Sequence, residues 1–327
     1  MDREPEGNRL NVDIGATLDR VDAYQRRRPW LSIPFAVVKR YGESDVGKLA
    51  ATLAYYGFFS LFPLLLVLSA LGGYVLQDNP ELQQRVLDSA IAQFPFVGNT
   101  IRDNVGSIEG SGVAVLVGLA LAVWAGLGAI RAAQSAMDTV WDVPRKRRPN
   151  TPKSIGLALL TLLVLAAFVI AAAVVATLVG TRGGLLIDVV KIVASLALNV
   201  AVFALGYRVL TTADVTWRQV APGAVMSGIG WTALLAIGGW LVSDRVSSSS
   251  HVYGTFAVVI GLLGWIYLGA QLMLLGAVTN VVVSNRLWPR SMRGELTSAD
   301  RLALRRSAEQ EERRPDEDVD VSFDTPP

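Results

Sequence analysis

Residues 155–180 read IGLALLTLLVLAAFVIAAAVVATLVG and contain no charged side chain. The hydrocarbon core of a bilayer is about 30 Å thick, and about 20 apolar helical residues are needed to cross it. A second run, residues 112–130, is equally free of charge. Runs of this length and composition are typical of transmembrane helices, so we predict an all-α integral membrane protein.

The composition of the whole chain agrees with this prediction. Of the 327 residues, 52% are apolar and 18% are charged, none is Cys, and the mean hydropathy is +0.41. A soluble domain carries about 25% charged residues. The composition excludes a soluble globular domain, a disulfide-stapled secreted domain and a thiolate metal site. We expect neither a cofactor nor a metal centre.

Six stretches of the chain are long and apolar enough to cross a bilayer. We predict transmembrane helices over residues 49–76, 112–131, 154–179, 185–208, 219–242 and 252–284. They form a predicted membrane domain, residues 49–284. A polar segment, residues 1–48, precedes this domain, and a tail, residues 285–327, follows it.

The Lys and Arg residues predict how the spans are oriented. With both termini in the cytoplasm, 25 of the 30 basic residues lie on the cytoplasmic side and 4 on the opposite side, while Lys191 lies inside a span. Cytoplasmic loops carry such an excess of basic residues. Residues 145–148, RKRR, are the strongest part of this signal. No aromatic or Gly-rich platform accompanies them, so we expect no nucleic-acid partner.

Two segments outside the predicted spans differ from them in composition. Residues 77–111 carry apolar residues at helical spacing in two stretches, which Pro95 and Gly98 separate. We predict two short amphipathic helices there, on the external face between the first and second spans. The tail is acidic and contains Pro from Glu309 onward, so we expect residues 285–327 to be cytoplasmic and largely disordered.

The fourth predicted span carries polar residues on one face. Asp188, Lys191, Ser195 and Asn199 are separated by three or four residues and fall within an arc of about 80° on a helix. Charged groups inside a membrane are costly and normally face a bundle interior or a wet cavity. This polar stripe is a candidate transport path, but Asp188 and Lys191 can also form a structural pair near the interface.

The first predicted span contains Tyr56, Ser60 and Pro63 on one face. Pro63 cannot donate a hydrogen bond to the carbonyl of Phe59, so we expect the helix to bend there. These three residues are a candidate hinge, and a fixed packing kink is the alternative.

The sixth predicted span has two distinct faces. Small residues that allow close helix packing recur on one of them, at Gly254, Gly261, Gly269 and Gly276. Tyr267 and Gln271 lie on nearly the opposite face. We therefore place this span centrally and expect Tyr267 and Gln271 to face the polar stripe of the fourth span.

Three motifs resemble the YihY/BrkB family of bacterial membrane proteins. They are LAYY at 53–56 with SLFP at 60–63, WRQVAPGA at 217–224, and YG at 253–254 followed by LGWIYL at 263–268 and LGA at 275–277. The resemblance covers roughly residues 30–287 and implies a six-helix protein of the inner membrane. Members were once mislabelled ribonuclease BN, and relatives have been tied to serum resistance and envelope lipid export. The resemblance supplies no catalytic residues.

Two functions remain open at this point. The first is a transporter or flippase of an envelope lipid or another amphipathic or anionic molecule. The second is an envelope scaffold or interaction protein that transports nothing. We do not expect an enzyme, because the spans contain no His cluster and the acids near their cytoplasmic ends, Asp138, Asp142 and Asp214, are scattered. Membrane lipids are the expected partners, and the Gly faces could serve within one chain or between copies in a homo-oligomer.

Overall fold

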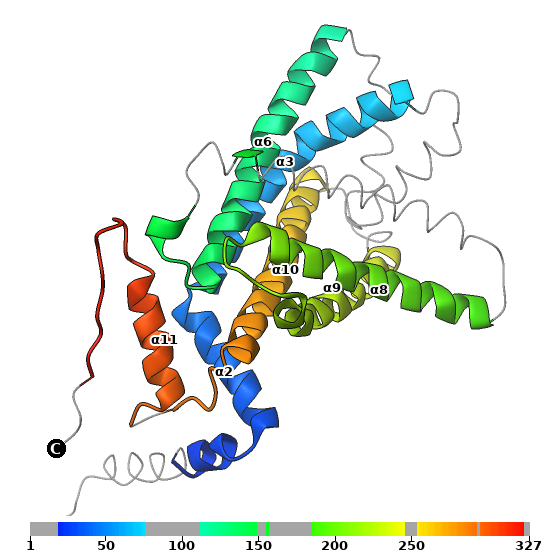
Figure 1. Ribbon diagram of the computed structural model, residues 1–327. Coiled ribbons are helices and arrows are strands. Elements are labelled where there is room, and N and C mark those ends of the chain that lie inside the picture. The colour runs from blue at the N-terminus through cyan, green and yellow to red at the C-terminus, as the bar shows by residue number, and fades with distance from the viewer. Residues whose placement is uncertain are drawn as a thin grey trace, which may run out of the picture.

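The computed structural model describes residues 19–75, 112–148, 155–156, 185–245, 254–292 and 295–323, and within these ranges it contains helices and no strand (Figure 1). The helices are α2 (Pro29–Glu43), α3 (Val46–Val75), α6 (Gly112–Val140), the 3₁₀ turn η1 (Arg145–Arg147), α8 (Leu185–Leu210), α9 (Trp217–Arg245), α10 (Gly254–Ser284) and α11 (Ser298–Glu309). The all-helical prediction is confirmed for this part of the chain.

Three described helices are long and apolar enough to cross a membrane by length and composition. The apolar parts are Ile192–Leu210 in α8, Trp217–Gly238 in α9 and Val259–Ser284 in α10. The third predicted span, apart from residues 155–156, and the predicted amphipathic helices of residues 77–111 lie outside the described residues.

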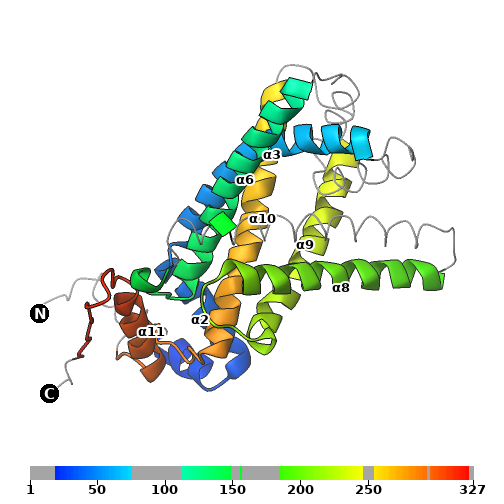
Figure 2. The ribbon, with the colours of Figure 1, turned by 45° about the horizontal axis from the view of Figure 1, so that its top comes forward.

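Helix α10 lies between two helix pairs. Helix α3 packs along α6, α8 packs along α9, and α10 contacts both α3 and α9 (Figures 1 and 2). The buried face of α10 includes Leu274, Ala277, Val278 and Val281, each with 0% of its surface exposed. Figure 2 shows α8 extending away from α6 and α10 along its length. The central position predicted for the sixth span therefore agrees with the structure.

Helix α6 continues beyond the predicted span, which ended at residue 131, as far as Val140. It ends in a Schellman motif, in which Val143 N–H donates to the carbonyl of Asp138 and Asp142 N–H donates to that of Thr139. Asp142 takes the left-handed conformation at φ 54° that this motif requires and that Asp tolerates better than most residues. The nine extra helical residues carry the basic turn η1 about 14 Å beyond the end of the predicted span.

The tail differs from the prediction that it is largely disordered. Residues 298–309 form α11, which begins with a capping box. The Thr297 hydroxyl accepts from Asp300 N–H, and the Asp300 carboxylate accepts from Thr297 N–H. Acidic composition predicts disorder only where the charges lack partners, and the carboxylate of Asp300 is bound to basic side chains of other segments.

Candidate functional site

The polar stripe lies on one uninterrupted helix. Asp188, Lys191, Ser195 and Asn199 all belong to α8, so the spacing from which the stripe was predicted holds. The described side chains differ in environment. Ser195 is exposed, whereas Asn199 is half-buried and donates a hydrogen bond of 3.1 Å to the Thr232 hydroxyl of α9. The end of the stripe at Asn199 is thus hydrogen-bonded to α9.

A second polar group joins α8, α9 and α10 nearer their basic ends. The Tyr207 hydroxyl of α8 donates to the carbonyl of Met273 in α10 over 2.8 Å and lies 2.8 Å from the Ser227 hydroxyl of α9. Asn280 of α10 accepts a hydrogen bond of 2.6 Å from Gly223 N–H of α9. Tyr207, Ser227 and Asn280 each have 0% of their surface exposed. We call these three residues the interhelical polar seam.

Tyr267 and Gln271 bond to each other, Gln271 also bonds to α2, and neither bonds to Ser195 or Asn199, the described side chains of the stripe. The Gln271 amide donates to the Tyr267 hydroxyl over 2.5 Å and accepts from the hydroxyl of Tyr41, which belongs to α2. Asn199 is bonded to α9 instead. The structure therefore separates the six predicted path residues into a group on α8 and a pair on α10 that faces α2. Helical spacing assigns residues to a face, but it does not identify the neighbouring helix.

The predicted hinge residues, Tyr56, Ser60 and Pro63, lie within the continuous helix α3. The Ser60 hydroxyl donates to the carbonyl of Gly57 over 2.8 Å and not to that of Phe59. Tyr56 is 41% exposed, and its ring lies beside Gly128 of α6. Figure 2 shows the later half of α3 running away from α6. The structure supplies one conformation, so hinge motion remains a prediction.

Of the four predicted packing glycines, Gly269 and Gly276 lie where another helix approaches closely. A Cβ at Gly276 would lie 2.1 Å from both the Tyr207 and Ser227 hydroxyl oxygens, and one at Gly269 would lie 2.9 Å from the Trp231 ring. Gly261 and Gly254 lie nearer the start of the same helix. The close packing thus concentrates where α10 meets α9 and the interhelical polar seam.

Charged side chains gather at the end of the bundle where α10 ends, beside α2 and α11. Arg290 is fully buried and donates to Asp300 over 2.6 Å and to Glu43 over 2.5 Å. Lys39 also donates to Asp300, over 2.8 Å. Burial by itself would raise the pKa of Asp300, but the bonds from Lys39 and Arg290 hold that pKa well below its ordinary value. The carboxylate is therefore charged throughout the physiological range.

A second ion pair extends this cluster to the end of α6. Arg40, 2% exposed, donates to the carboxylate of Asp142. Burial raises the pKa of Asp142, and the charge of Arg40 offsets part of that effect. We call the ion-paired residues of this end the basal charge network. Its members are Lys39, Arg40, Glu43, Asp142, Arg290 and Asp300.

The three acids considered for an enzyme have separate structural surroundings. Asp138 is 2% exposed and accepts hydrogen bonds through one oxygen from Thr211 and from the N–H and hydroxyl of Thr212. Asp142 pairs with Arg40, and Asp214 is exposed. Among the described residues, no group of three or more His, Cys, Asp or Glu side chains is arranged to hold a metal ion.

Asp138 yields a test of stability against pH. Burial raises its pKa, and the bonds from Thr212 offset only part of that effect. We expect Asp138→Asn to retain stability, because one Asn oxygen can accept the same hydrogen bonds without a buried charge. Asp138→Ala leaves the Thr212 N–H unpaired and should cost about 1–3 kcal/mol.

The sign of the pH effect follows from the raised pKa. The contribution of wild-type Asp138 is complete below its unfolded pKa and is lost as pH rises through the folded value. The stability of wild type relative to Asp138→Asn should therefore fall as pH rises from the ordinary aspartate pKa of about 3.9 toward neutrality. Thermal unfolding in detergent, followed by tryptophan fluorescence, measures this difference. A constant difference across this range would contradict the prediction.

Sequence reasoning missed both the interhelical polar seam and the basal charge network. The basic residues of the network had been counted only as evidence of orientation. A usable signal was present, because Glu43 follows Lys39 and Arg40, and Asp142 precedes the basic residues 145–148. Apart from Arg290 and Asp300, which are 10 positions apart, the ion-pair partners of the network lie about 100 to 260 positions apart along the chain. Local spacing rules do not relate residues so far apart.

Comparisons with known proteins agree with this architecture. The family model described as Virulence factor BrkB matches residues 37–298. An uncharacterized protein of Dickeya dadantii (strain 3937) is 29% identical over 262 residues, which cover 72% of this chain and 78% of that protein. The inner membrane protein YhjD of Escherichia coli (strain K12) is 26% identical over 149 residues, which cover 43% of this chain and 44% of YhjD.

Two further relatives show how the names of this group vary. YfkH of Bacillus subtilis (strain 168), named as ribonuclease-like, is 24% identical over 76% of this chain and 93% of its own length. A UPF0761 membrane protein of Stenotrophomonas maltophilia (strain R551-3) is 29% identical over 73% of this chain and 57% of its own length. No solved structure matches. Because the family match covers most of the chain, this protein belongs to the BrkB family of membrane proteins.

Proposed function

We propose that the chain is a six-span protein of the bacterial cytoplasmic membrane that moves an envelope lipid, or another amphipathic or anionic molecule, along the polar stripe of α8. The observation that carries the proposal is the stripe itself. Two charged and two polar residues share one face of the first part of α8, residues 185–199, which is otherwise apolar. Such residues are costly in a membrane unless a ligand, water or a partner residue meets them.

The surroundings of α8 support the same proposal. Ser195 is exposed in the middle of the helix, and α8 extends away from α6 and α10 (Figure 2). The hydrogen bond from Asn199 to Thr232 attaches the Asn199 end of the stripe to α9. A headgroup could meet the stripe while its acyl chains remain among the exposed apolar side chains of α8, such as Val189 and Ile192.

The contacts at the basic end of the bundle support the proposed orientation. The count of basic residues places residues 1–48, 131–153, 208–218 and 285–327 in the cytoplasm. In the structure these four segments contact one another through the Lys39–Asp300, Arg40–Asp142 and Asp138–Thr212 interactions. Segments that bond to one another lie on the same side of a membrane. Six spans with both termini cytoplasmic satisfy this requirement.

The transport proposal predicts a defect at Lys191. We expect Lys191→Met to lower the transbilayer movement of labelled anionic phospholipid at least fivefold in liposomes that contain the purified protein. Val193→Met is the matched control, because it places the same side chain on the opposite face of α8, where Val193 is exposed. Equal movement in both variants, with both folded, would contradict a path along the stripe.

A non-transporting interaction protein is the second candidate. The observation that favours it is the folded tail, in which α11 and the residues after it dock onto the basic end of the bundle. This candidate predicts that the Lys191→Met protein keeps its cellular function. It also predicts that changes in the tail abolish that function.

A further inference from the structure

The tail beyond α11 lies against the basic turn that follows α6. Arg145 N–H donates to the carbonyl of Gln310 over 3.1 Å, and Lys146 N–H donates to that of Glu312 over 2.8 Å. Two backbone hydrogen bonds at successive residues fix the alignment of the two segments. We call residues 145–148 the basic turn and residues 310–320 the acidic strap.

Side-chain charges reinforce this alignment. Lys146 pairs with Glu312 over 2.8 Å and also donates to the carbonyl of Glu317. Arg145 pairs with Glu311 over 3.1 Å. The Lys146 ammonium group and the Val319 N–H lower the pKa of Glu312. The strap is therefore bound as an acidic peptide would be, through its main chain and its carboxylates.

Polar contacts hold the strap in place, and apolar packing contributes little. The buried hydrophobic core of the described residues extends along α11 only as far as Ala303. A cavity of about 350 Å³ remains between the basic turn, α11 and the strap, and Trp141, Lys146 and Arg306 are among its lining residues. Of the two ion pairs, Lys146–Glu312 is largely buried, whereas Arg145–Glu311 is exposed, and an exposed pair contributes little stability and weakens with salt. A strap held in this way can be displaced.

The basic turn is also far from the lipid surface in this arrangement. Nine helical residues separate the end of the predicted span from the end of α6, a distance of about 14 Å. The surface potential of a membrane falls off within about 8–10 Å at physiological salt. A soluble partner therefore meets this surface more readily than a headgroup does. The family match ends at residue 298, so the strap lies beyond it.

We propose that the basic turn is a binding surface for an acidic peptide segment of a cytoplasmic partner, and that the acidic strap is an intramolecular ligand occupying this surface until the partner displaces it. The surface supplies two main-chain donors and the Arg145 and Lys146 cations. Arg147 is exposed and has no ion-pair partner among the residues that the structure describes, so it remains available to a partner carboxylate. The proposal does not depend on the transport function.

The first experiment measures binding of a fluorescent peptide, residues 309–323, to the full-length protein in detergent. The tethered strap competes at a high effective concentration, so wild type should bind the peptide weakly. Glu312→Gln weakens the tethered strap and should bind the peptide about tenfold more tightly. Adding Lys146→Gln to that variant should abolish binding. Glu295→Gln and Lys48→Gln are the matched controls, because both residues are exposed and neither has a hydrogen bond or ion pair to the strap among the described residues.

The second experiment follows the strap directly. The chain contains no Cys, so spin labels at Ser135→Cys and Ser322→Cys report one distance across the interface. Excess unlabelled peptide should broaden that distance distribution, and nanodiscs with or without anionic phosphatidylglycerol should give the same distribution. Equal peptide binding by wild type and Glu312→Gln, or binding that survives Lys146→Gln, would overturn the proposal. So would release of the strap by anionic lipid alone.

Discussion

Gly223→Ala should destabilise the protein by about 3 kcal/mol or more, although alanine is the better helix former. A Cβ at Gly223 would lie 2.0 Å from the carbonyl oxygen of Gly276 and 2.6 Å from its carbonyl carbon. These are backbone atoms, so no rotamer change relieves the overlap, and α9 must move away from α10. Inserting volume into a packed core typically costs about 1–3 kcal/mol, and more when the backbone has to move.

The control for this prediction lies on α10. A Cβ at Gly264 would meet no atom within 4 Å. Gly264→Ala should therefore show only the gain in helix propensity, about 0.8–1 kcal/mol. The opposite signs of the two effects separate helix packing from helix propensity. The stability of both variants is measured by thermal unfolding, followed by tryptophan fluorescence, and by the fraction of protein that stays monodisperse after heating. A neutral Gly223→Ala would disprove the close approach of α9 and α10.

Arg290→Met should cost about 3–5 kcal/mol, since removing one partner of a buried ion pair leaves the other charge uncompensated. Arg290 is fully buried and links Asp300 of α11 to Glu43 of α2. Without Arg290, the carboxylate of Asp300 retains Lys39 but loses its most deeply buried partner. We expect α11 to detach from α2 before the apolar helices separate.

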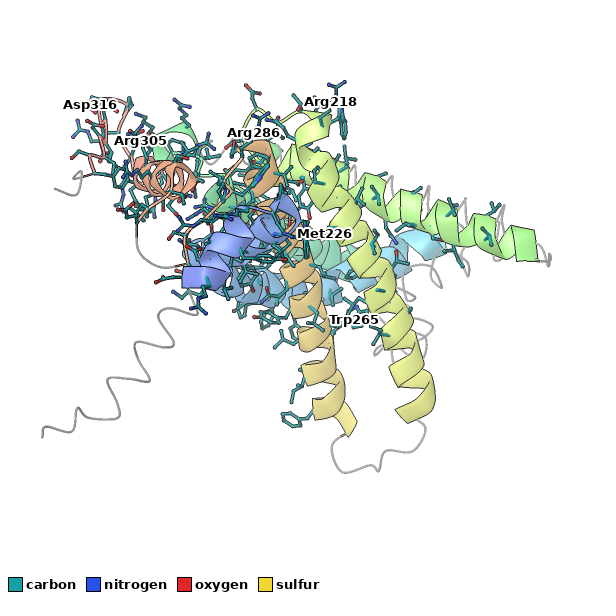
Figure 3. All side chains as sticks on the ribbon, turned by 90° about the horizontal axis from the view of Figure 1, so that it is seen from below. Arg218, Met226, Trp265, Arg286, Arg305 and Asp316 are labelled. Atoms are coloured by element: carbon teal, nitrogen blue, oxygen red, sulfur yellow. The ribbon has the colours of Figure 1, made fainter. Side chains whose placement is uncertain are left out.

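Arg305→Met is the matched control for Arg290→Met. Arg305 lies on α11, is exposed and has no ion pair among the described residues, so its loss should change stability by less than about 0.5 kcal/mol. In Figure 3, Arg305 lies with Arg286, Arg218 and Asp316 along the charged end, whereas Met226 and Trp265 lie among α9 and α10. Detachment of α11 is measured as faster cleavage within residues 295–323 during limited proteolysis. Equal protection in both variants would contradict the assigned role of Arg290.

The pH dependence of this region follows from Asp300. Its pKa is lowered, so its contribution to stability is present above the ordinary aspartate pKa of about 3.9 and is lost only as pH falls through the lower folded value. The contacts of Asp300 with Lys39 and Arg290 should therefore hold at pH 5 as firmly as at pH 7. This behaviour is opposite to that of Asp138, whose raised pKa makes its contribution decline as pH increases.

The sequence predicted where the helices lie along the chain far better than which helices contact one another. Apolar length identified α8, α9 and α10, because the cost of an unpaired backbone in a bilayer leaves few alternatives to a helix. Residue spacing placed Gly276 on a packing face. It could not show that Gln271 bonds to Tyr41 of α2, since the choice of neighbour depends on how the helices tilt and cross. Composition misjudged α11, whose Asp300 pairs with Lys39, 261 positions earlier in the chain, as well as with the nearby Arg290.

The link between Arg290, Asp300 and α2 also has a consequence for biosynthesis. Helix α2 precedes the apolar helices, while residue 300 follows them all. Lys39 and Glu43 are therefore synthesised long before their partners, Asp300 and Arg290. They remain hydrated and unpaired while the apolar helices are synthesised and inserted. The contacts of α11 with α2 can form only after the last apolar helix has been synthesised. Their formation, seen as protease resistance of α11, would report that the whole chain has been synthesised and its basic end assembled.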